Sequence, residues 1–355
     1  MITEKLNKIK SIQSLSAFEI DEKKIIDFYT KNFSHRNYRL ENLWKWLYRT
    51  DFFKSKKHPV IAMDGHEVIG HMGIIPFWLY LEEKKVLASW YTDMHVVPQH
   101  RGKGAARLIT KELMKLTDIH FGLVGNDKSM GVFKEFGWAD SYKGYLHHFL
   151  IQPMNHPKFA KFSKYFKWIY FLINFLFKNI FCKYYILKKN NNNILKSESL
   201  NKENIKIFID AKENQKLIKP VRDENYLYWR FLNSPEIKNY KIFKDNNNLA
   251  AIVKERKDKP NSWHLDILLI NNLSDDKNII SFLAEIILWG RAKNYSYVKV
   301  YISNKNLSRK ISRNLFSITI NPRFFYCAKD KKIMDILKNG TYFWQLADSD
   351  FEIIL

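Results

Sequence analysis

The 355-residue sequence has little cysteine and few acidic residues for its length. Its two cysteines, Cys182 and Cys327, are too few for a disulfide framework and too far apart for a metal-binding motif. Disulfide-rich secreted proteins are therefore excluded, and a reducing compartment is favoured. The first ten residues lack the apolar core of a secretion signal, so we expect a cytoplasmic protein.

Because acidic residues are few, the chain has a large positive net charge. The chain has 59 Lys and Arg against 36 Asp and Glu, a net charge of +23. Such an excess predicts an anionic partner, which could be nucleic acid, a phosphorylated cofactor or substrate, or an acidic membrane surface. An AT-rich genome, which favours Lys and Asn, would give similar totals. The excess is uneven, however, because no Asp or Glu occurs from Ser141 to Ser197.

The same order of expected elements occurs twice along the chain. In each half, helices come first, then antiparallel strands, then a strand, helix, strand and helix. The matching segments are 43–48 with 226–231, 89–97 with 262–270, and Asn126 with Asn304. Three matches in one order indicate a duplicated fold. We predict a mixed α/β protein with domains at 1–150 and 201–355, joined by a basic, aromatic-rich connector at 151–200.

The strongest functional signal is the segment 96–105, Val-Val-Pro-Gln-His-Arg-Gly-Lys-Gly-Ala. A strand ends at Pro98, a turn with two glycines follows, and an amphipathic helix begins at once. Glycine permits a tight turn and leaves no side chain between the backbone amides and a ligand. Several N–H groups then converge at a helix N-terminus, which favours an anion such as a pyrophosphate. Arg101, Lys103 and Arg107 add positive charge nearby.

This loop resembles the acetyl-CoA loop of the GNAT superfamily of N-acetyltransferases, whose pattern is Gln/Arg-x-x-Gly-x-Gly/Ala. Gln99, Gly102 and Gly104 fill the pattern, and the preceding Val-x-Pro and the following helix also match. The loop lacks the Gly-Lys-Ser/Thr of nucleotide triphosphatases and the third glycine of dinucleotide-binding folds. The resemblance covers residues 20–150 and reaches the second half only through the internal repeat.

The resemblance implies that each domain is a splayed mixed sheet flanked by helices, and that the first domain alone holds acetyl-CoA. Pantetheine would pair with the strand that ends at Val97, and the pyrophosphate would sit on residues 99–105. The implied cofactor-binding residues are Met94, Val96, Val97, Gln99, Arg101, Gly102, Lys103, Gly104, Ala105 and Asn126. In the second half, 271–278 has no glycine, and Asp275 and Asp276 would repel a pyrophosphate. We interpret that half as a degenerate copy, and we expect no metal.

Asp93 and His95 are the candidate catalytic residues. They lie two positions apart on one strand and so point to the same side of it. Histidine can accept a proton from an amine near neutral pH. Asp93 matches a position that is often acidic in the superfamily, but Asp266 repeats it in the half without a coenzyme loop, so an anchoring role stays open. Where many members have a tyrosine that protonates the departing thiolate, this chain has Phe133.

The segment 158–189 mixes lysine with aromatic residues. Its first lysines recur every three residues, at positions 158, 161, 164 and 167. This composition is typical of a helix in a membrane interface, which would make the protein peripheral at the inner membrane face. The uncharged stretch 168–177 has ten residues, against the ~20 that span a bilayer. A helical hairpin packed between the domains would explain the same sequence.

These observations predict an N-acyltransferase that uses acyl-CoA, with acetyl-CoA as the expected donor. Tandem chains with one degenerate copy resemble bacterial acyltransferases of cell-surface polysaccharide assembly. We therefore expect an amine-bearing small molecule as the acceptor, namely an amino sugar that is free, a sugar nucleotide or lipid-linked. The alternatives are an aminoacyl transferase of the FemABX kind, which needs no coenzyme loop, and a non-catalytic basic module for nucleic acid. The intact loop favours the acyltransferase without a nucleic-acid partner.

Overall fold

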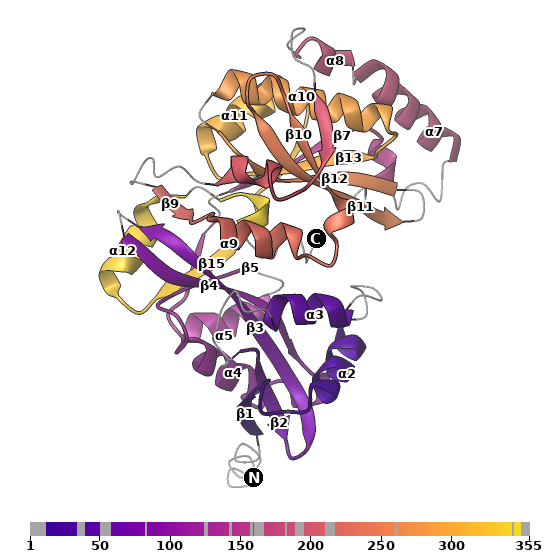
Figure 1. Ribbon diagram of the computed structural model, residues 1–355. Coiled ribbons are helices and arrows are strands. Elements are labelled where there is room, and N and C mark those ends of the chain that lie inside the picture. Colours follow the sequence, from indigo (N-terminus) through magenta and orange to yellow (C-terminus); the bar gives the residue numbers. More distant parts are fainter. Residues whose placement is uncertain are drawn as a thin grey trace.

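Two mixed β-sheets, each flanked by helices, make up the protein in the computed structural model (Figure 1). This architecture confirms the predicted fold class. The structure describes residues 12–33, 40–49, 58–81, 84–123, 127–141, 144–156, 159, 167–181, 183–188, 195–209, 217–259, 262–273, 275–342 and 344–348.

The first sheet has nine strands among the described residues, in the order β1-β2-β3-β4-β5-β15-β6, with β9 beside β3 and β16 beside β9. Their bounds are β1 Ile12–Ser16, β2 Val60–Asp64, β3 Glu67–Leu81, β4 Lys84–Val96, β5 Ile119–Leu123, β6 Ala139–Ser141, β9 Leu217–Pro220, β15 Phe324–Ala328 and β16 Thr341–Tyr342. Helices α2 (Glu22–Asn32) and α3 (Leu40–Tyr48) pack on one face, and α4 (Ala105–Leu113) and α5 (Asp127–Glu135) pack on the other.

The second sheet has seven strands in the described part of the chain, in the order β14-β7-β13-β12-β11-β10-β8. Their bounds are β7 Tyr145–Leu150, β8 Lys196–Ser199, β10 Tyr240–Lys244, β11 Ala250–Lys259, β12 Ser262–Ile270, β13 Tyr297–Ile302 and β14 Ile318–Ile320. The central strands β12 and β13 run parallel, as β4 and β5 do in the first sheet. Helices α10 (Asp276–Ala292) and α11 (Lys305–Asn314) cover one face of the sheet.

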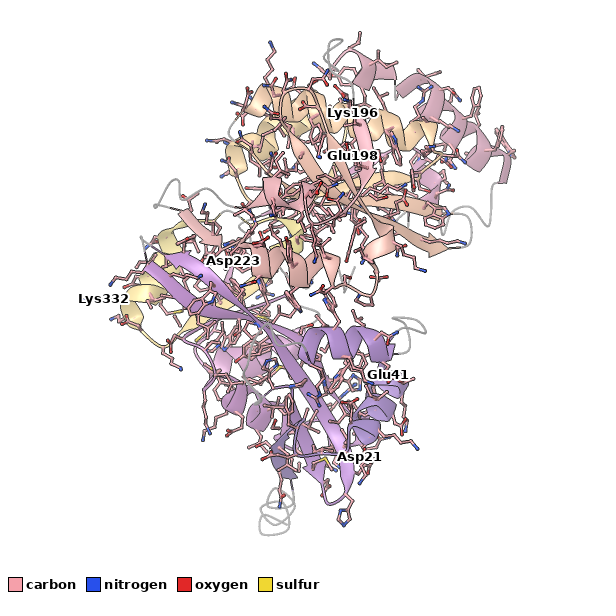
Figure 2. The ribbon with its side chains drawn as sticks, viewed as in Figure 1. Asp21, Glu41, Lys196, Glu198, Asp223 and Lys332 are labelled. Atoms are coloured by element: carbon pink, nitrogen blue, oxygen red, sulfur yellow. The ribbon has the colours of Figure 1, made fainter. Side chains whose placement is uncertain are left out.

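The remaining helices lie around these two layers. Helix α7 (Lys167–Leu176), the π-helical turn η5 (Phe177–Phe181) and α8 (Lys183–Ile186) follow one another along the outer side of the second sheet's helices (Figure 1). The others are η2 Pro98–His100, η3 Pro153–Asn155, η6 Asn204–Phe208, α9 Glu224–Leu227, η7 Tyr228–Leu232, η8 Ile237–Asn239, α12 Lys331–Asn339 and η9 Leu346–Asp348. Aspartates cap several helices: Asp21 accepts a hydrogen bond in the first turn of α2 and Asp223 does so in α9 (Figure 2).

A strand near the end of each half belongs to the sheet of the other half. β7, from the first half, pairs with β13 and β14, whereas β15, from the second half, pairs with β5 and β6. The exchange is reciprocal, since each strand takes the equivalent place in the opposite sheet. Neither half therefore completes its own sheet. The division at residues 150 and 200 stays a prediction, but strand pairing crosses it in both directions.

Trp46 and Trp229 mark the relation between the two halves. Their rings stack with centroids 5.5 Å apart. The Trp46 indole N–H donates to the backbone oxygen of Trp229 at 2.9 Å, and the Trp229 indole N–H donates to that of Trp46 at 3.2 Å. These residues match one another in the repeated segments 43–48 and 226–231. A reciprocal contact between matching residues indicates a two-fold relation, which supports the predicted duplication.

Candidate active site

The site is built where β4 and β5 separate. The two strands run parallel up to the pair Tyr91 and Gly122. Beyond it, the pairing of β4 with β3 shifts by one residue, and Asp93 adopts a positive φ of 58°. This β-bulge bends β4 away from β5. Within the described residues, no strand pairs with the β5 side of Met94 to Val96. Apart from the Val96 carbonyl, which accepts from Arg101, backbone groups there are available to a ligand.

A cavity of about 390 Å³ lies at this opening. The predicted cofactor-binding residues that line it are Met94, Val96, Arg101, Gly102, Gly104 and Ala105. The predicted catalytic residue His95 also lines it. Val97, Gln99 and Lys103 lie in the same strand and loop without lining the cavity, and Asn126 lies outside the described residues. The cofactor-binding role of all ten stays a prediction.

Sequence reasoning missed three lining residues, His100, Ala106 and Val132. His100 and Ala106 are neighbours of the glycines, so the loop motif itself was a signal for them. Val132 comes from α5, and the only hint was its position beside Phe133.

Both glycines of the loop have a backbone conformation that favours glycine. The φ of Gly102 is 79° and that of Gly104 is 91°, and a Cβ at either position would meet no atom within 4 Å. The requirement is therefore conformational, and the space above the loop is open to a ligand. Gly104 is also the N-cap of α4, where no side chain accepts from the first amides. Such a helix start suits a pyrophosphate, because free N–H groups and the helix dipole both face it.

The positive side chains around the loop have different surroundings. The Arg101 side chain donates from Nε to the backbone oxygen of Val96 at 2.9 Å. Arg107 forms a two-pronged ion pair with Glu135, at 2.5 and 2.8 Å, which joins α4 to α5. That hydrogen bonding lowers the pKa of Glu135. No carboxylate among the described residues pairs with Arg101 or Lys103, so these two are the countercharges open to an anion.

Asp93 lies in the bulge with its carboxylate turned toward the helices. It is buried, and its Oδ2 accepts hydrogen bonds from Tyr29 at 2.6 Å and Tyr48 at 3.0 Å. The Trp44 indole donates to His71 Nε2 at 3.2 Å, so His71 Nδ1 carries a proton and donates to the Asp93 backbone oxygen at 3.1 Å. Asp93 thus ties α2 and α3 to the bulge. It does not line the cavity, and its catalytic role stays a prediction.

His95 combines access to the cavity with an unpaired nitrogen. Its ring packs against Phe28 and Phe33, with centroids 6.0 and 5.6 Å away. The Nε2 atom is buried and has no hydrogen-bond partner among the described residues. Burial, and then the charge of Arg101, lower the pKa of His95 from its usual value. The ring is therefore neutral at pH 7 and able to accept a proton.

Phe133 and Tyr91 lie on the α4–α5 face of the sheet. Phe133 is buried against Tyr91, Trp138 and Phe325, with ring centroids 6.1, 4.7 and 5.7 Å away. It is a core residue, as its side chain predicts. Tyr91 is the last paired residue of β4 next to β5, and burial raises its pKa well above the usual value. The Tyr91 phenol therefore keeps its proton at the point where the strands separate.

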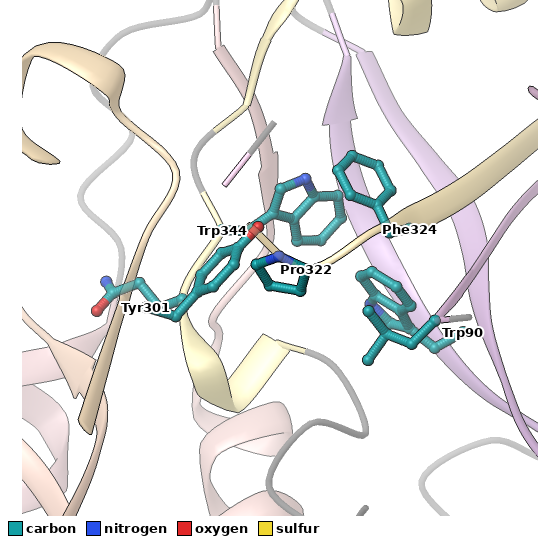
Figure 3. Close-up of a pocket in the computed structure, with 7 residues that line it drawn as sticks. Trp90, Tyr301, Pro322, Phe324 and Trp344 are labelled. Atoms are coloured by element: carbon teal, nitrogen blue, oxygen red, sulfur yellow. The ribbon is translucent and has the colours of Figure 1, made fainter. Parts of the chain in front are cut away.

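On the opposite face of the first sheet, aromatic side chains leave little room beside the opening. A hollow of only about 10 Å³ lies between Trp90 and Leu123 of the first half and Tyr301 and Trp344 of the second. That volume is near the minimum for one water. Figure 3 shows how Trp90, Tyr301, Pro322, Phe324 and Trp344 surround it. The Trp90 and Trp344 rings meet edge to face at 5.3 Å.

The corresponding opening in the second sheet is occupied by the chain itself. Gln345 accepts from the Ile270 N–H at 2.6 Å and donates to the Ile270 carbonyl at 2.9 Å. The Trp344 N–H donates to Ser303 Oγ, just beyond β13, at 2.9 Å. Asp275 caps α10 by accepting from two amides at 3.1 Å. Both features of the first site, an open strand edge and an uncapped helix, are thus absent here in the described residues.

Comparison with known proteins identifies the first half. Residues 14–120 match the acetyltransferase (GNAT) domain family. Residues 14–120 are thus assigned to a GNAT domain. The GNAT match includes the loop 96–105 and both candidate catalytic residues, Asp93 and His95.

Solved structures extend the GNAT likeness to the second half. A GCN5-related N-acetyltransferase from Anabaena variabilis is 11% identical, with a TM-score of 0.59, over 90% of this chain and 73% of that one. One from Kribbella flavida is 10% identical, with a TM-score of 0.55, over 89% and 71%. N-myristoyltransferase from Saccharomyces cerevisiae with bound myristoyl-CoA is 10% identical, with a TM-score of 0.56, over 90% and 79%. At these identities the likeness shows the fold alone. No curated protein matches the chain.

None of the helices in the described residues is both long enough and apolar enough to span a bilayer. No three His, Cys, Asp or Glu side chains in this part of the chain are grouped as a metal site.

Proposed function

We propose that the protein transfers an acyl group from coenzyme A to an amine, with the thioester held between β4 and β5. The observation that carries this proposal is the uncapped start of α4, behind Gly102 and Gly104, which faces the 390 Å³ cavity at the opening between the strands. The amides of the loop and of the first turn of α4 would bind the pyrophosphate. The backbone edge of β4 at Met94 and the Val96 N–H would hydrogen-bond the pantetheine amides, as a neighbouring strand would, while the Val96 carbonyl accepts from Arg101.

His95 is the proposed general base. It takes a proton from the attacking amine as the nitrogen–carbon bond forms and the carbon–sulfur bond breaks, and the thiolate leaves with the electron pair of that bond. A thiolate of pKa ~8.5 is a moderate leaving group, and water supplies its proton. Asp93 is a positioning residue in this scheme, since it holds the bulge that carries Met94 and His95. This division is supported by the cavity lining, which includes His95 and not Asp93.

Acetyl is the proposed acyl group. An acyl chain that continued past the opening would meet Trp90 and Trp344, and the hollow between these side chains holds only about 10 Å³. That space suits a water and not a hydrocarbon tail. A protein of the same fold has been solved with bound myristoyl-CoA, so the fold does not limit the chain length. The aromatic packing of Trp90 and Trp344 supports the short donor.

The proposed acceptor is the amine of an amino sugar of bacterial cell-surface polysaccharide assembly. This proposal rests on the resemblance of a tandem chain with one degenerate copy to such acyltransferases.

We place the reaction in the cytoplasm, in keeping with the low cysteine content. Cys327 is a free, buried thiol, and burial raises its pKa to about 11, so it stays protonated.

Release of free thiol from acetyl-CoA and from myristoyl-CoA tests the proposal, with amino-sugar nucleotides as acceptors. A sugar nucleotide without an amine is the control acceptor. We expect thiol release from acetyl-CoA only when a free amine is present. Preference for myristoyl-CoA would contradict the short donor. Absence of acetyl-CoA binding, together with transfer from an aminoacyl-tRNA, would replace the proposal with the FemABX-like alternative.

A further inference from the structure

The outer side of α7, of η5 and of the chain just after α8 exposes large apolar side chains to solvent. We call the outer aromatic surface the set Trp168, Phe171, Leu172, Phe175, Ile180 and Leu187. Trp168 is 70% exposed, Phe171 72% and Leu187 79%. In α7 the exposed positions follow the spacing i, i+3, i+4 and i+7, which places them on one face of the helix. A contiguous exposed apolar face of this kind marks an interaction site.

Helix α7 has the reverse of the usual polarity of a surface helix. Its polar side contacts the protein: Asn174 Oδ1 accepts from the Met154 N–H at 2.9 Å, and Asn174 Nδ2 donates to Asn155 at 3.4 Å. Just beyond α7, Lys178 donates to the Asn294 side chain at 2.7 Å. A helix that packs on a core normally buries its apolar side and exposes its polar side. The apolar face of α7 is therefore not part of the core that the described residues form.

Basic residues surround this surface. No acidic residue occurs from Ser141 to Ser197. The end of α11 lies beside this surface, since Lys188 donates to Asn314 at 3.4 Å. Just beyond α11, the Phe316 carbonyl accepts from Tyr185 of α8 at 2.7 Å. The exposed basic residues of α11 are Lys305, Arg309, Lys310 and Arg313, of which Lys310 forms an ion pair with Asp276. The result is an apolar face with a positive rim.

We propose that the outer aromatic surface binds an anionic lipid bilayer, with α7 lying in the plane of the interface. A bilayer of this kind presents negative charge at the headgroups and apolar chains just below them, which complements a positive rim around Trp and Phe side chains. A second copy of this chain is a poorer occupant, because it would bring two positive rims together. Membrane binding goes beyond acyl transfer and does not depend on it. It would bring the acetyltransferase site to lipid-linked acceptors.

The experiment is flotation of the full-length protein with phosphatidylcholine vesicles, with and without phosphatidylglycerol. We expect binding to the vesicles that contain phosphatidylglycerol and release at high salt. The triple variant Trp168→Ser, Phe171→Ser, Phe175→Ser should weaken the partition by at least about 100-fold. Lys188→Gln and Arg313→Gln should each weaken it about 5-fold. Acetyl-CoA binding should be unchanged in all three.

The matched control is the double variant Phe18→Ser, Trp263→Ser. These two side chains are 44% and 43% exposed and lie outside α7, α8 and α11. The control should float as the wild type does, whereas Trp168→Ser, Phe171→Ser should not. Three outcomes would overturn the proposal: a wild type that stays unbound at low salt, a triple variant that binds as the wild type does, or a self-associating protein that only the triple variant disperses. Binding to RNA in preference to vesicles would also overturn it.

Discussion

The two halves share a frame and differ in what occupies the opening between their central parallel strands. In the first half, β4 and β5 part around a cavity of about 390 Å³, and the helix behind them is uncapped. In the second, the Gln345 side chain pairs with the backbone of Ile270, and Asp275 caps α10. In the second half, side chains of the protein thus hydrogen-bond the backbone groups at the strand opening and at the helix start. In the first half, the equivalent groups are left to a ligand. A duplicated fold can therefore keep its sheet without keeping its ligand site.

The buried aspartates at matching positions show the same divergence. Asp93 accepts from the neutral hydroxyls of Tyr29 and Tyr48. Asp266 lies beside Lys299 at 3.0 Å and Arg256 at 3.5 Å. Burial alone would raise the pKa of Asp266, but the charges of Lys299 and its neighbours outweigh it and hold the pKa well below the usual range. Tyrosine hydroxyls hold the aspartate in one copy, and a charged cluster surrounds it in the other.

The largest effect is expected at the proposed base. His95→Gln should lower kcat by roughly 10²- to 10⁴-fold and leave acetyl-CoA affinity nearly unchanged. Because burial lowers the pKa of His95, the wild-type kcat/KM should be flat through neutral pH and fall only below pH ~6.5, where the ring takes up a proton. Rate measurements across pH should show that this acid limb disappears in the variant. If the fall of kcat/KM at acid pH were unchanged in the variant, the general base would be another residue.

The next effect concerns the loop glycines. Gly104→Val should weaken acetyl-CoA binding by at least about 100-fold, because a side chain there enters the space that the pyrophosphate needs. Gly65→Val is the matched control: Gly65 also has a positive φ, 59°, and open space around it, but lies in the β2–β3 turn. Calorimetric titration should find normal affinity in the control. An equal loss of acetyl-CoA affinity in both variants would mean that backbone strain at a positive φ, and not contact with the loop, causes the loss.

The buried aspartates allow a direct test of the two anchors. Asp266→Asn leaves the buried Lys299 without its full countercharge and should cost about 3–5 kcal/mol of unfolding free energy. Asp93→Asn loses one strong acceptor of neutral donors and should cost about 1–3 kcal/mol. Urea unfolding measures both. A large fall in turnover with unchanged stability in Asp93→Asn would instead make Asp93 a catalytic residue.

The smallest effect is expected at the cap of α10. Asp275→Ala removes the acceptor of two amides and should lower stability by about 0.5–2 kcal/mol. It should not create a second coenzyme site, because Gln345 still fills the strand opening. Thermal unfolding and titration with acetyl-CoA on the same sample check both parts. A gain of a second site would show that the carboxylate alone had blocked it.

Local sequence was enough for the fold class and the loop, because a strand, two glycines and a helix are contiguous at 96–105. The duplication was also visible, and the contact of Trp46 with Trp229 supports it. The exchange of β7 and β15 left no sequence signal, since a short apolar strand suits either sheet. Long-range contacts such as that of Gln345 with Ile270 could not be predicted, because a glutamine side chain can hydrogen-bond any backbone group and the sequence does not specify which one.

The claim that only the first half binds coenzyme is tested most directly by calorimetric titration of the full-length wild type with acetyl-CoA, alongside Gly104→Val. The open β4 edge, the uncapped α4 and the filled second opening predict one binding site per chain, lost in the variant. Two sites per chain, or one site that survives in Gly104→Val, would contradict the account.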